Sequence, residues 1–422
     1  MSKTGGRRKK MWILYVVIGL VMLFAAFFIA EIIFREYMRN RSFGAAEIDT
    51  TASQGTMELF YEADGTPVLV KRRADGSLCD DFKVLSSTDF HLRSDDLSDF
   101  TLEVFGKFLD KEKPDLVVLV GDNVVDRTDT VIHEKLKKFF EDRGQYWAFV
   151  LGNHDGEGYA EKYPDRDSRK WAYEALAGSP HCLSHCEDAG YGYGNGVVLL
   201  KNSKGKIAQA VFLLDSDQYM TEESCAEIGK PYVKGCAFLR PCQVEWYKNR
   251  IRELTAQNGG EVPKSIMYFH IPLHEFEEAY GDLKNPRVKR LYGDAWEKVD
   301  CSCYSTGMFD AVKESGSTQA VICGHDHINC FCVEYDGIKL LYSQGLQWDM
   351  SYNRRKNNKF MAAWYALDKK ACFYVEGVTI AMIREDGTAE FMPKYAQFEG
   401  MLEGKAKELE IVSYGVKGTE PR

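Results

Sequence analysis

The sequence predicts an α/β domain built around a mostly parallel β-sheet and preceded by one transmembrane helix. Three observations support this fold class. Strand-like and helix-like segments alternate from residue 82 onward. Asp and His residues follow directly after several of the strand-like segments. Residues 11–30 form an uncharged apolar run. Such alternation is typical of βαβ units, in which polar residues gather at the carboxyl ends of the strands.

The apolar run near the start predicts a membrane anchor over residues 11–34. About 20 apolar residues cross a bilayer, so the run is long enough. Five Lys or Arg side chains precede the run and three follow it closely. The denser positive flank predicts that residues 1–10 are a cytoplasmic basic segment and that the main domain lies outside the cell membrane.

A cleaved secretory signal is the alternative reading of this run. The apolar stretch is longer than the core of a usual signal, which has about 7–15 residues. No convincing small-x-small cleavage site follows Ala30. An uncleaved single-pass anchor is therefore the preferred interpretation, with cleavage left open.

The first residues outside the membrane predict a stalk over residues 35–56, small and polar from residue 42 onward. The main domain is expected over residues 57–395. The turn signals Asp64-Gly65 and Asp75-Gly76 separate strand-like runs. They predict an opening hairpin or meander.

The next part of the chain alternates regularly between strand-like and helix-like segments. In order, these segments are Phe82–Asp89, Asp96–Lys111, Asp115–Asp122, Thr128–Asp142 and Tyr146–Gly152. A chain with this rhythm predicts parallel strands joined by helices. Ligands of such a sheet gather at the carboxyl ends of its strands.

Residues 156–195 are rich in Gly, Tyr, Ser and Asp and predict an excursion over the mouth of the site, with a helix over Ser168–Leu176. A later helix follows Pro241, a residue favoured in the first turn. Further strands are expected at Ala208–Asp215, Ser265–His270 and Gln319–Gly324.

The C-terminal part is expected to be rich in strands over residues 331–393, with hairpins at Asp336-Gly337 and Asp386-Gly387. Residues 396–422 are expected to form a tail. A surface helix is predicted from about Lys394 to Leu409, followed by a loose end over residues 410–422.

The charge of the exterior part is strongly negative. Residues 1–41 hold eight of the 54 Lys and Arg and two of the 63 Asp and Glu, which leaves 46 basic against 61 acidic side chains, a net charge of about −15. This balance argues against binding of nucleic acid or anionic lipid by bulk electrostatics. It does not exclude a phosphorylated small molecule, because bound cations would dominate the local field.

All twelve cysteines follow the apolar run, from Cys79 to Cys372. An even number in an exported chain suits disulfides, although their pairing is not readable. Cys301-x-Cys303 and Cys330-x-Cys332 offer metal ligands, but neither has the spacing of a structural zinc site. Disulfides and buried thiols are the alternatives, and Cys323 is expected to be a small buried residue.

Five short blocks supply a set of metal-type side chains. They are Asp89-Phe90-His91, Gly121-Asp122-Asn123, Gly152-Asn153-His154-Asp155, His270 and Gly324-His325-Asp326-His327, and they contain five of the nine histidines. Two divalent ions need a shared oxygen ligand, for which the Asp122 carboxylate is the natural candidate. The nitrogen and oxygen donors suit manganese, iron or zinc better than calcium.

These donors predict hydrolysis by a water that loses its proton between two metal ions. His154 adjoins Asn153 and is expected to protonate a leaving group or steady the transition state. Each block alone has an ordinary structural explanation, since N-H-D can cap a helix and a lone histidine is often a buried structural residue. The conjunction of five blocks favours a dinuclear metal site.

Other polar residues receive structural interpretations. His274 and Glu275 are expected at the surface or behind the site, and Asp155 is expected to orient His154 or cap a turn. Asp126 is a weaker candidate for supporting His154. The remaining histidines outside the blocks, His133, His181 and His185, are expected to be structural or exposed.

In sequence and order the blocks resemble the calcineurin-like metallophosphoesterase superfamily, whose pattern is D-x-H, G-D, G-N-H-[DE], H and G-H-x-H. The resemblance covers residues 82–345. The stretches Phe269–Leu273, Cys323–Asn329 and Leu214–Ser216, with Gln243 and Trp246, are similar to a single-domain branch related to purple acid phosphatases. The resemblance implies two packed mixed sheets flanked by helices.

The same resemblance implies the roles of individual residues. One metal ion would be bound by Asp89, His91, Asp122 and His327, and the second by Asp122, Asn153, His270 and His325. His154 would act on the leaving group during in-line attack of a hydroxide bound by both metals. Purple acid phosphatases carry an iron-binding tyrosine three residues after the bridging aspartate, where this chain has Val125. A colourless enzyme is therefore expected.

The sequence thus predicts a membrane-anchored, extracytoplasmic metallophosphoesterase that acts on a small-molecule or exterior phosphate ester. Monoesters are favoured by the branch that the chain resembles. A phosphodiesterase or nucleotide hydrolase with the same metal core is the alternative within this class. A non-catalytic sensor or scaffold that keeps the metals is the alternative from another class.

Overall fold

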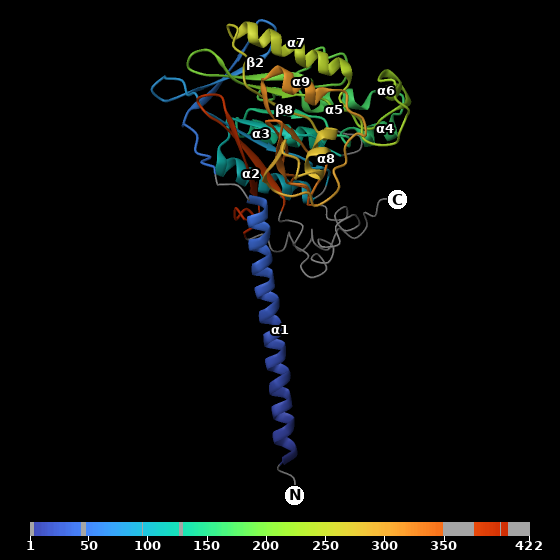
Figure 1. Cartoon of the computed structure of the whole chain (residues 1–422). Helices are drawn as coiled ribbons and strands as arrows, with labels where there is room; N and C mark the ends of the chain where they lie inside the picture. Colours follow the sequence, from blue (N-terminus) through green and yellow to red (C-terminus); the bar gives the residue numbers. More distant parts are fainter. Residues whose placement is uncertain are drawn as a thin grey trace.

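A computed structural model shows an N-terminal helix projecting from a globular body (Figure 1). The residues it describes are 4–43, 48–94, 96–125, 130–348, 375–396 and 398–403.

The N-terminal helix α1 runs without a break over Thr4–Phe43, through the predicted anchor and into the predicted stalk. Its apolar part, Trp12–Ala30, has 19 residues with a mean hydropathy of 2.9, and none of it is buried against the body. Within the described ranges, α1 is the one helix long and apolar enough to cross a membrane. A fully exposed apolar helix in water would be costly, which is consistent with a single-pass anchor.

The body contains two β-sheets. The large sheet has nine strands in the order β1-β2-β6-β7-β8-β10-β12-β11-β9, and the small sheet has five in the order β14-β13-β3-β4-β5. The strands are β1 Thr56–Tyr61, β2 Pro67–Arg72, β3 Phe82–Ser87, β4 Leu116–Val120, β5 Trp147–Val150, β6 Gly196–Lys201, β7 Ile207–Leu213, β8 Ser265–Tyr268, β9 Val288–Tyr292, β10 Thr318–Cys323, β11 Cys332–Tyr335, β12 Ile338–Tyr342, β13 Gly377–Ile383 and β14 Ala389–Tyr395.

Both sheets combine a run of parallel strands with antiparallel strands toward at least one edge. Strands β3, β4 and β5 pair in parallel, as do β7, β8, β10 and β12. The antiparallel strands include the hairpins β1–β2 and β13–β14, at the predicted turns Asp64-Gly65 and Asp386-Gly387. The predicted α/β fold with mixed sheets is therefore confirmed.

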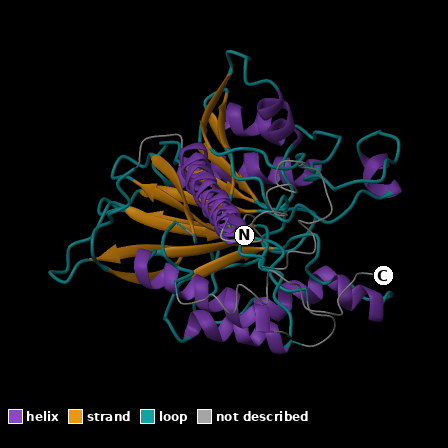
Figure 2. Cartoon of the chain, turned by 90° about the horizontal axis from the view of Figure 1, so that it is seen from below, coloured by secondary structure: helices purple, strands orange, loops and turns teal. Residues whose placement is uncertain are grey.

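Helices cover the outer faces of the two sheets (Figure 2). The described helices of the body are α2 Asp96–Glu112, α3 Val131–Glu141, α4 Glu157–Lys162, α5 Ser168–Leu176, α6 Glu222–Glu227, α7 Pro241–Gln257, α8 His274–Gly281 and α9 Met308–Ser315. Helices α2, α3 and α5 share a buried core with the small sheet, whereas α7, α8 and α9 share one with the large sheet.

A third core lies between the sheets. Successive residues of β4 alternate between two cores, because Val118 packs toward the large sheet and Val117 toward the helices. Side chains of β7, β8 and β10 meet those of β3, β4 and β5 in the inner core. This alternation is the two-residue period of a strand buried on both faces, and it produces the four layers.

Several details differ from the sequence-based expectations, among them helices α8 and α9, which were not predicted. Strand β6 was not expected, although it is buried and joins β2 to β7. The helix predicted from Lys394 is wrong at its start, because Lys394 and Tyr395 pair with β13 as part of β14. Cross-strand pairing outweighs the helical preference of that segment. The rest of the tail, residues 404–422, lies outside the described residues.

The cysteines of the described part are free thiols. Eleven of the twelve are described, none is in a disulfide, and Cys372 lies outside the described residues. The disulfide alternative therefore has no pair in this part of the chain. Cys323 is fully buried, as expected.

Candidate metal centre

The predicted ligands meet where the carboxyl ends of five strands converge. Asp89 and His91 follow β3, Asp122 follows β4, and Asn153 and His154 follow β5 of the small sheet. His270 follows β8 and the pair His325 and His327 follows β10, all on the large sheet. The centre therefore lies at the junction of the two sheets, as expected for a site at strand ends.

The loops that carry these residues are hydrogen-bonded to one another. The amide of Asp89 donates to Gly121 O at 3.0 Å, and the amide of His91 donates to Asp122 O at 2.9 Å. The amide of Gly324 donates to His270 O at 3.0 Å. Backbone contacts thus fix the relative positions of the blocks before any cation binds.

Several ligands have a strained backbone. Asp89, His91, Asp122 and His325 have φ values of 52°, 46°, 50° and 78°. Side chains other than glycine adopt this left-handed region rarely and at a cost of about 1–3 kcal/mol. Such strain concentrates at functional sites, where the surrounding contacts enforce it.

Two glycines allow the blocks to approach closely. A Cβ on Gly152 would lie 2.1 Å from Asp122 Oδ1, and a Cβ on Gly121 would lie 2.4 Å from His270 Nδ1. Gly121 also has a φ of +91°. Any larger residue at Gly121 or Gly152 would collide with a neighbouring ligand side chain, so both blocks require glycine there.

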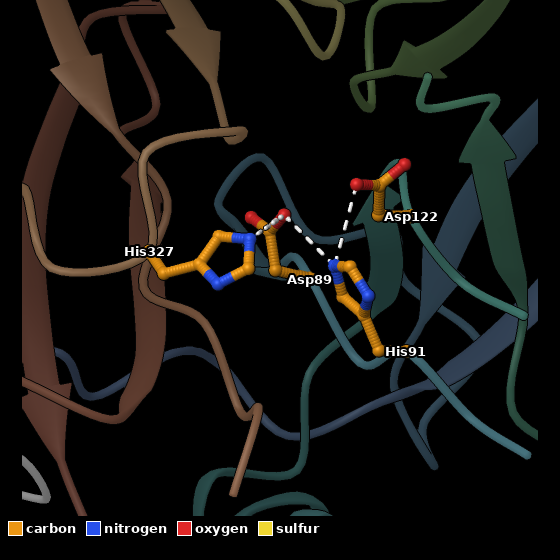
Figure 3. A group of neighbouring side chains, drawn as sticks. All are labelled: Asp89, His91, Asp122 and His327. Atoms are coloured by element: carbon orange, nitrogen blue, oxygen red, sulfur yellow. Dashed lines mark ion pairs between the residues drawn. The ribbon is translucent and has the colours of Figure 1, made fainter. Parts of the chain in front are cut away.

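The first group of donors is Asp89, His91, Asp122 and His327, one atom from each lying within 4.8 Å of the others (Figure 3). Asp89 Oδ1 is 3.4 Å from His327 Nε2 and 3.7 Å from His91 Nε2. His91 Nε2 is also 3.3 Å from Asp122 Oδ2.

The second group surrounds Asn153. Its side-chain oxygen Oδ1 lies 3.1 Å from His270 Nε2 and 2.8 Å from His325 Nδ1. His270 Nε2 is 3.3 Å from Asp122 Oδ2, the same oxygen that faces His91. Asp122 therefore stands between the two groups, while its Oδ1 accepts a hydrogen bond from the amide of His154 at 2.8 Å.

The donor atoms of the first group fit a divalent cation. Asp89 Oδ1, Asp122 Oδ2 and His91 Nε2 are buried and have no hydrogen-bond partner within the described residues. Buried polar atoms without partners are rare and costly in native proteins. All three face the same space, so a cation there would satisfy them together.

The electrostatics of the cluster favour cation binding. Burial opposes ionisation of Asp122, yet the charges of His270 and His154 and the close approach of the His270 and His91 rings keep its pKa well below the usual range. Burial lowers the pKa of His91 and of His270, but nearby carboxylates raise both to about 9. In the absence of a cation, two protons neutralise the carboxylates.

The ring of His154 is held by Glu157, a residue that sequence reasoning missed. His154 Nδ1 lies 2.6 Å from Glu157 Oε2, at the start of α4. Burial lowers the pKa of His154, but the charge of Asp122 and the hydrogen bond and charge of Glu157 raise it to about 9. The His154 side chain is 36% exposed, so it lies at the mouth of the centre.

Asp155 caps the loops and does not contact the ring of His154 through any described hydrogen bond. Its carboxylate accepts bonds from the amides of Gly152 at 2.8 Å, Asn123 at 3.0 Å and Val124 at 3.0 Å. This is the turn-capping alternative for Asp155. Asp126, the other candidate supporter of His154, lies outside the described residues.

Two residues from the chain that follows β7, Tyr219 and Cys236, contact the second group. Tyr219 OH is 3.4 Å from Asn153 Nδ2 and donates to Glu157 Oε1 at 3.2 Å. Cys236 Sγ is 3.3 Å from His325 Nε2. No local pattern marks these side chains, because only the folding of a distant loop brings them to the centre.

The excursion over residues 156–195 is anchored beside the centre. The buried guanidinium of Arg169 pairs with Asp215 and donates to Gly152 O at 2.9 Å. The first residues of the excursion, including Glu157, reach the mouth of the centre. The predicted helix Ser168–Leu176 is confirmed as α5.

The remaining polar residues lie away from the cluster or play structural parts. His133 is buried on α3 against Trp171, and His181 contacts Glu141. His185 contacts Glu187. Glu275 accepts a hydrogen bond from Ser305 on the outer side of the large sheet.

Comparison with known proteins identifies the family. The family model described as calcineurin-like phosphoesterase matches residues 82–329, which is more than half of the chain. The chain belongs to the calcineurin-like phosphoesterase family. It is a phosphoesterase, a hydrolase of phosphoric esters, as the five blocks predicted.

The relatives of this phosphoesterase carry phosphatase names. It is 26% identical over 310 residues to "Probable inactive purple acid phosphatase 29" of Arabidopsis thaliana, covering 65% of this chain and 74% of that protein. It is 29% identical over 241 residues to "Phosphatase DCR2" of Saccharomyces cerevisiae, covering 54% and 38% respectively. A dimetal phosphatase from Danio rerio aligns with a TM-score of 0.42 and 10% identity, covering 74% of this chain and 98% of that one.

Proposed function

We propose that this phosphoesterase is a single-pass membrane enzyme that hydrolyses phosphate monoesters outside the cytoplasm with two bound metal ions. The central observation is the buried cluster in which Asp122 Oδ2 faces a histidine of each donor group at 3.3 Å. One carboxylate oxygen in this position is suited to joining two cations.

The ligand assignment follows from the two groups. Asp89, His91, Asp122 and His327 would hold one ion, and Asp122, Asn153, His270 and His325 would hold the other. When bound, the two ions activate a water as nucleophile and neutralise the charge of the phosphate. Oxygen and imidazole donors without a thiolate among the ligands fit manganese, iron or zinc.

His154 would protonate the departing alkoxide. Its ring is partly exposed at the mouth of the centre, and Glu157 holds Nδ1 at 2.6 Å, so Nε2 is left to face the ester. Protonation of a leaving oxygen by a positioned imidazolium contributes about 10²–10⁴-fold to rate. The carboxylate of Glu157 keeps the ring oriented and favours its protonated form.

The proposed preference for monoesters rests on the phosphatase names of the relatives. The proposal that the enzyme is colourless rests on Val125. That residue stands three positions after Asp122, and its amide donates to Leu92 O at 2.9 Å. An aliphatic side chain cannot supply a tyrosinate ligand to iron.

An assay of the full chain in detergent tests the proposal. With added Mn²⁺, we expect turnover of aryl phosphate monoesters in preference to diesters. His154→Ala and Asp122→Asn should each abolish most of this turnover. Preferential diester cleavage would replace the monoester assignment by the phosphodiesterase alternative.

A scaffold without catalysis is the second candidate, because the names of three Arabidopsis relatives include the word inactive. The presence of His154 and of the complete ligand set favours the enzyme. Metal bound by the full chain without turnover of either ester class would support the scaffold instead.

The proposed topology is supported by the exposed apolar helix α1 and by the basic residues that precede it. Residues 1–10 would be cytoplasmic, 11–34 the anchor, 35–56 the stalk and 57–395 the phosphoesterase domain, with 396–422 as a tail. Protease added to intact cells should remove the domain and leave a small membrane-bound fragment. Protection of the whole chain would reverse this orientation.

A further inference from the structure

A second group of metal-type side chains lies outside the dinuclear cluster. A ring nitrogen of His274, a carboxylate oxygen of Glu277 and the thiol of Cys301 all lie within 4.8 Å of one another. His274 and Glu277 are three residues apart on α8, so they share one face of the helix. Cys301 belongs to the segment between β9 and α9.

The spacing of these atoms suits a tetrahedral ion. Cys301 Sγ lies 3.8 Å from Glu277 Oε2. A sulfur and an oxygen ligand of one tetrahedral zinc lie about 3.5 Å apart, given bond lengths of about 2.3 and 2.0 Å. Only a small adjustment of flexible side chains is needed to bring the donors to ligand distance.

Negatively charged side chains surround the thiol of Cys301. Their mutual repulsion favours binding of a cation in the cluster. Burial and the charges of Glu277 and Asp326 raise the pKa of Cys301 to about 12. His274 Nδ1 is buried and has no hydrogen-bond partner within the described ranges. A lysine also approaches the cluster: Lys298 Nζ is 3.5 Å from Glu277 Oε1, but its side chain is 76% exposed and free to move away.

We propose that His274, Glu277 and Cys301 form a zinc site separate from the dinuclear centre. Nitrogen, oxygen and sulfur donors together match the borderline-soft preference of Zn²⁺. Three protein ligands leave a fourth position for water. A bound cation would convert the thiol to thiolate and relieve the local negative charge.

The position of the site indicates its effect on the fold. Binding would join α8 to the segment that contains Cys301. The neighbouring amide of Asp300 donates to both oxygens of Asp326 at 3.2 Å, and Asp326 lies between His325 and His327. The zinc would therefore stabilise the segment that supports the last ligand block, without contacting the substrate.

Cobalt substitution of the full chain in detergent tests this site directly. A thiolate bound to Co²⁺ gives a charge-transfer band in the near ultraviolet, which oxygen and imidazole ligands do not give. We expect the band in the unmodified chain and its loss in Cys301→Ser. Zinc-loaded Cys301→Ser should contain about one equivalent less Zn²⁺ per chain.

Two matched variants separate this site from its neighbours. Cys303→Ser removes an exposed thiol two residues away, and Cys236→Ser removes the thiol beside His325. Both should keep the band. Glu277→Gln should weaken or remove it while leaving every cysteine in place, which serves as the second test if Cys301→Ser does not fold.

Each result for the cobalt band either supports or overturns the proposed zinc site. Loss of the band in Cys301→Ser and its weakening in Glu277→Gln, with retention in Cys303→Ser and Cys236→Ser, would support the site. Absence of the band in the unmodified chain would overturn it. Loss in Cys236→Ser with retention in Cys301→Ser would also overturn it, because the thiolate would then belong to the cluster at His325.

Discussion

The two halves of the dinuclear centre are built from different chemistry. The first half, Asp89, His91 and His327, adds its own carboxylate to the shared Asp122. The second half consists of Asn153, His270 and His325, and its own oxygen donor is the neutral amide of Asn153. Both are buried, yet the second half also touches Tyr219 and Cys236 from the large-sheet side.

This difference in charge has a consequence for cation binding. Two carboxylates face the first position and one faces the second, so the first should bind a divalent cation more tightly. The second cation would keep more of its positive charge and polarise a bound phosphate more strongly. The first half would therefore favour tight cation binding, and the second would favour polarisation of the phosphate. Asp122 is common to both halves.

Asp122→Asn should have the largest effect, because it damages both halves at once. Even loss of a group outside the ligand set costs about 10–100-fold in affinity or activity, so we expect a fall of at least about 100-fold in kcat/KM. Steady-state hydrolysis of an aryl phosphate measures this. Asp99→Asn, on the exposed face of α2, is the control and should keep normal activity.

Cation affinity should rise steeply with pH. His91 and His270 have pKa values of about 9 in the protein without cations, so both are protonated at pH 7. The pKa of His325 is lowered to about 4 and that of His327 to about 3, with burial the largest cause for each, so these rings are already neutral. Binding needs neutral rings and would release about two protons.

Release of two protons implies a gain of up to about 100-fold in overall affinity per pH unit between pH 7 and 9. Calorimetry in buffers of different ionisation enthalpy counts the released protons. His91→Asn should lower the count by about one, because one half then binds without displacing a proton. Release of almost no protons by the unmodified chain would contradict the prediction that His91 and His270 are protonated before cations bind.

Glu157→Gln should lower kcat by about 10-fold, because it weakens the positioning of a group whose acid catalysis contributes about 10²–10⁴-fold. The carboxylate raises the pKa of His154, so its removal lowers that pKa. The proton donor is then lost at a lower pH, and the basic limb of the kcat profile should move toward lower pH. Glu161→Gln on the same helix is the matched control.

Tyr219→Phe should have the smallest effect and, of the two halves of the centre, should act only on the second. It removes hydrogen bonds to Asn153 and Glu157 but no proposed ligand. One hydrogen bond contributes about 0.5–1.5 kcal/mol, so a change of about 2–10-fold in kcat/KM is expected. Metal content should not change, and Tyr232→Phe at an exposed position should be silent.

Much of this fold and of the cluster is predictable from the sequence. The β3, β4 and β5 strands read as apolar runs because both of their faces are buried, and the ligand blocks follow directly from the strand ends. Alternation of strands and helices was enough to place Asp89, Asp122 and Asn153 together.

The missed parts depend on contacts between distant segments. Glu157 lies near His154 in sequence, but only the start of α4 turns its carboxylate toward the ring. Tyr219 and Cys236 reach the second half from loops without a distinctive pattern. The predicted tail helix is wrong at its start because Lys394 belongs to β14, whose pairing with the distant strand β13 cannot be seen from the local sequence.

The most direct test is a Mn²⁺ binding isotherm of the full chain in detergent, with Asp89→Asn and Asp122→Asn beside it. We predict two binding steps of unequal affinity, of which Asp89→Asn weakens the tighter and Asp122→Asn weakens both. A loss confined to one step in Asp122→Asn would contradict the account, because that carboxylate would then serve only one half.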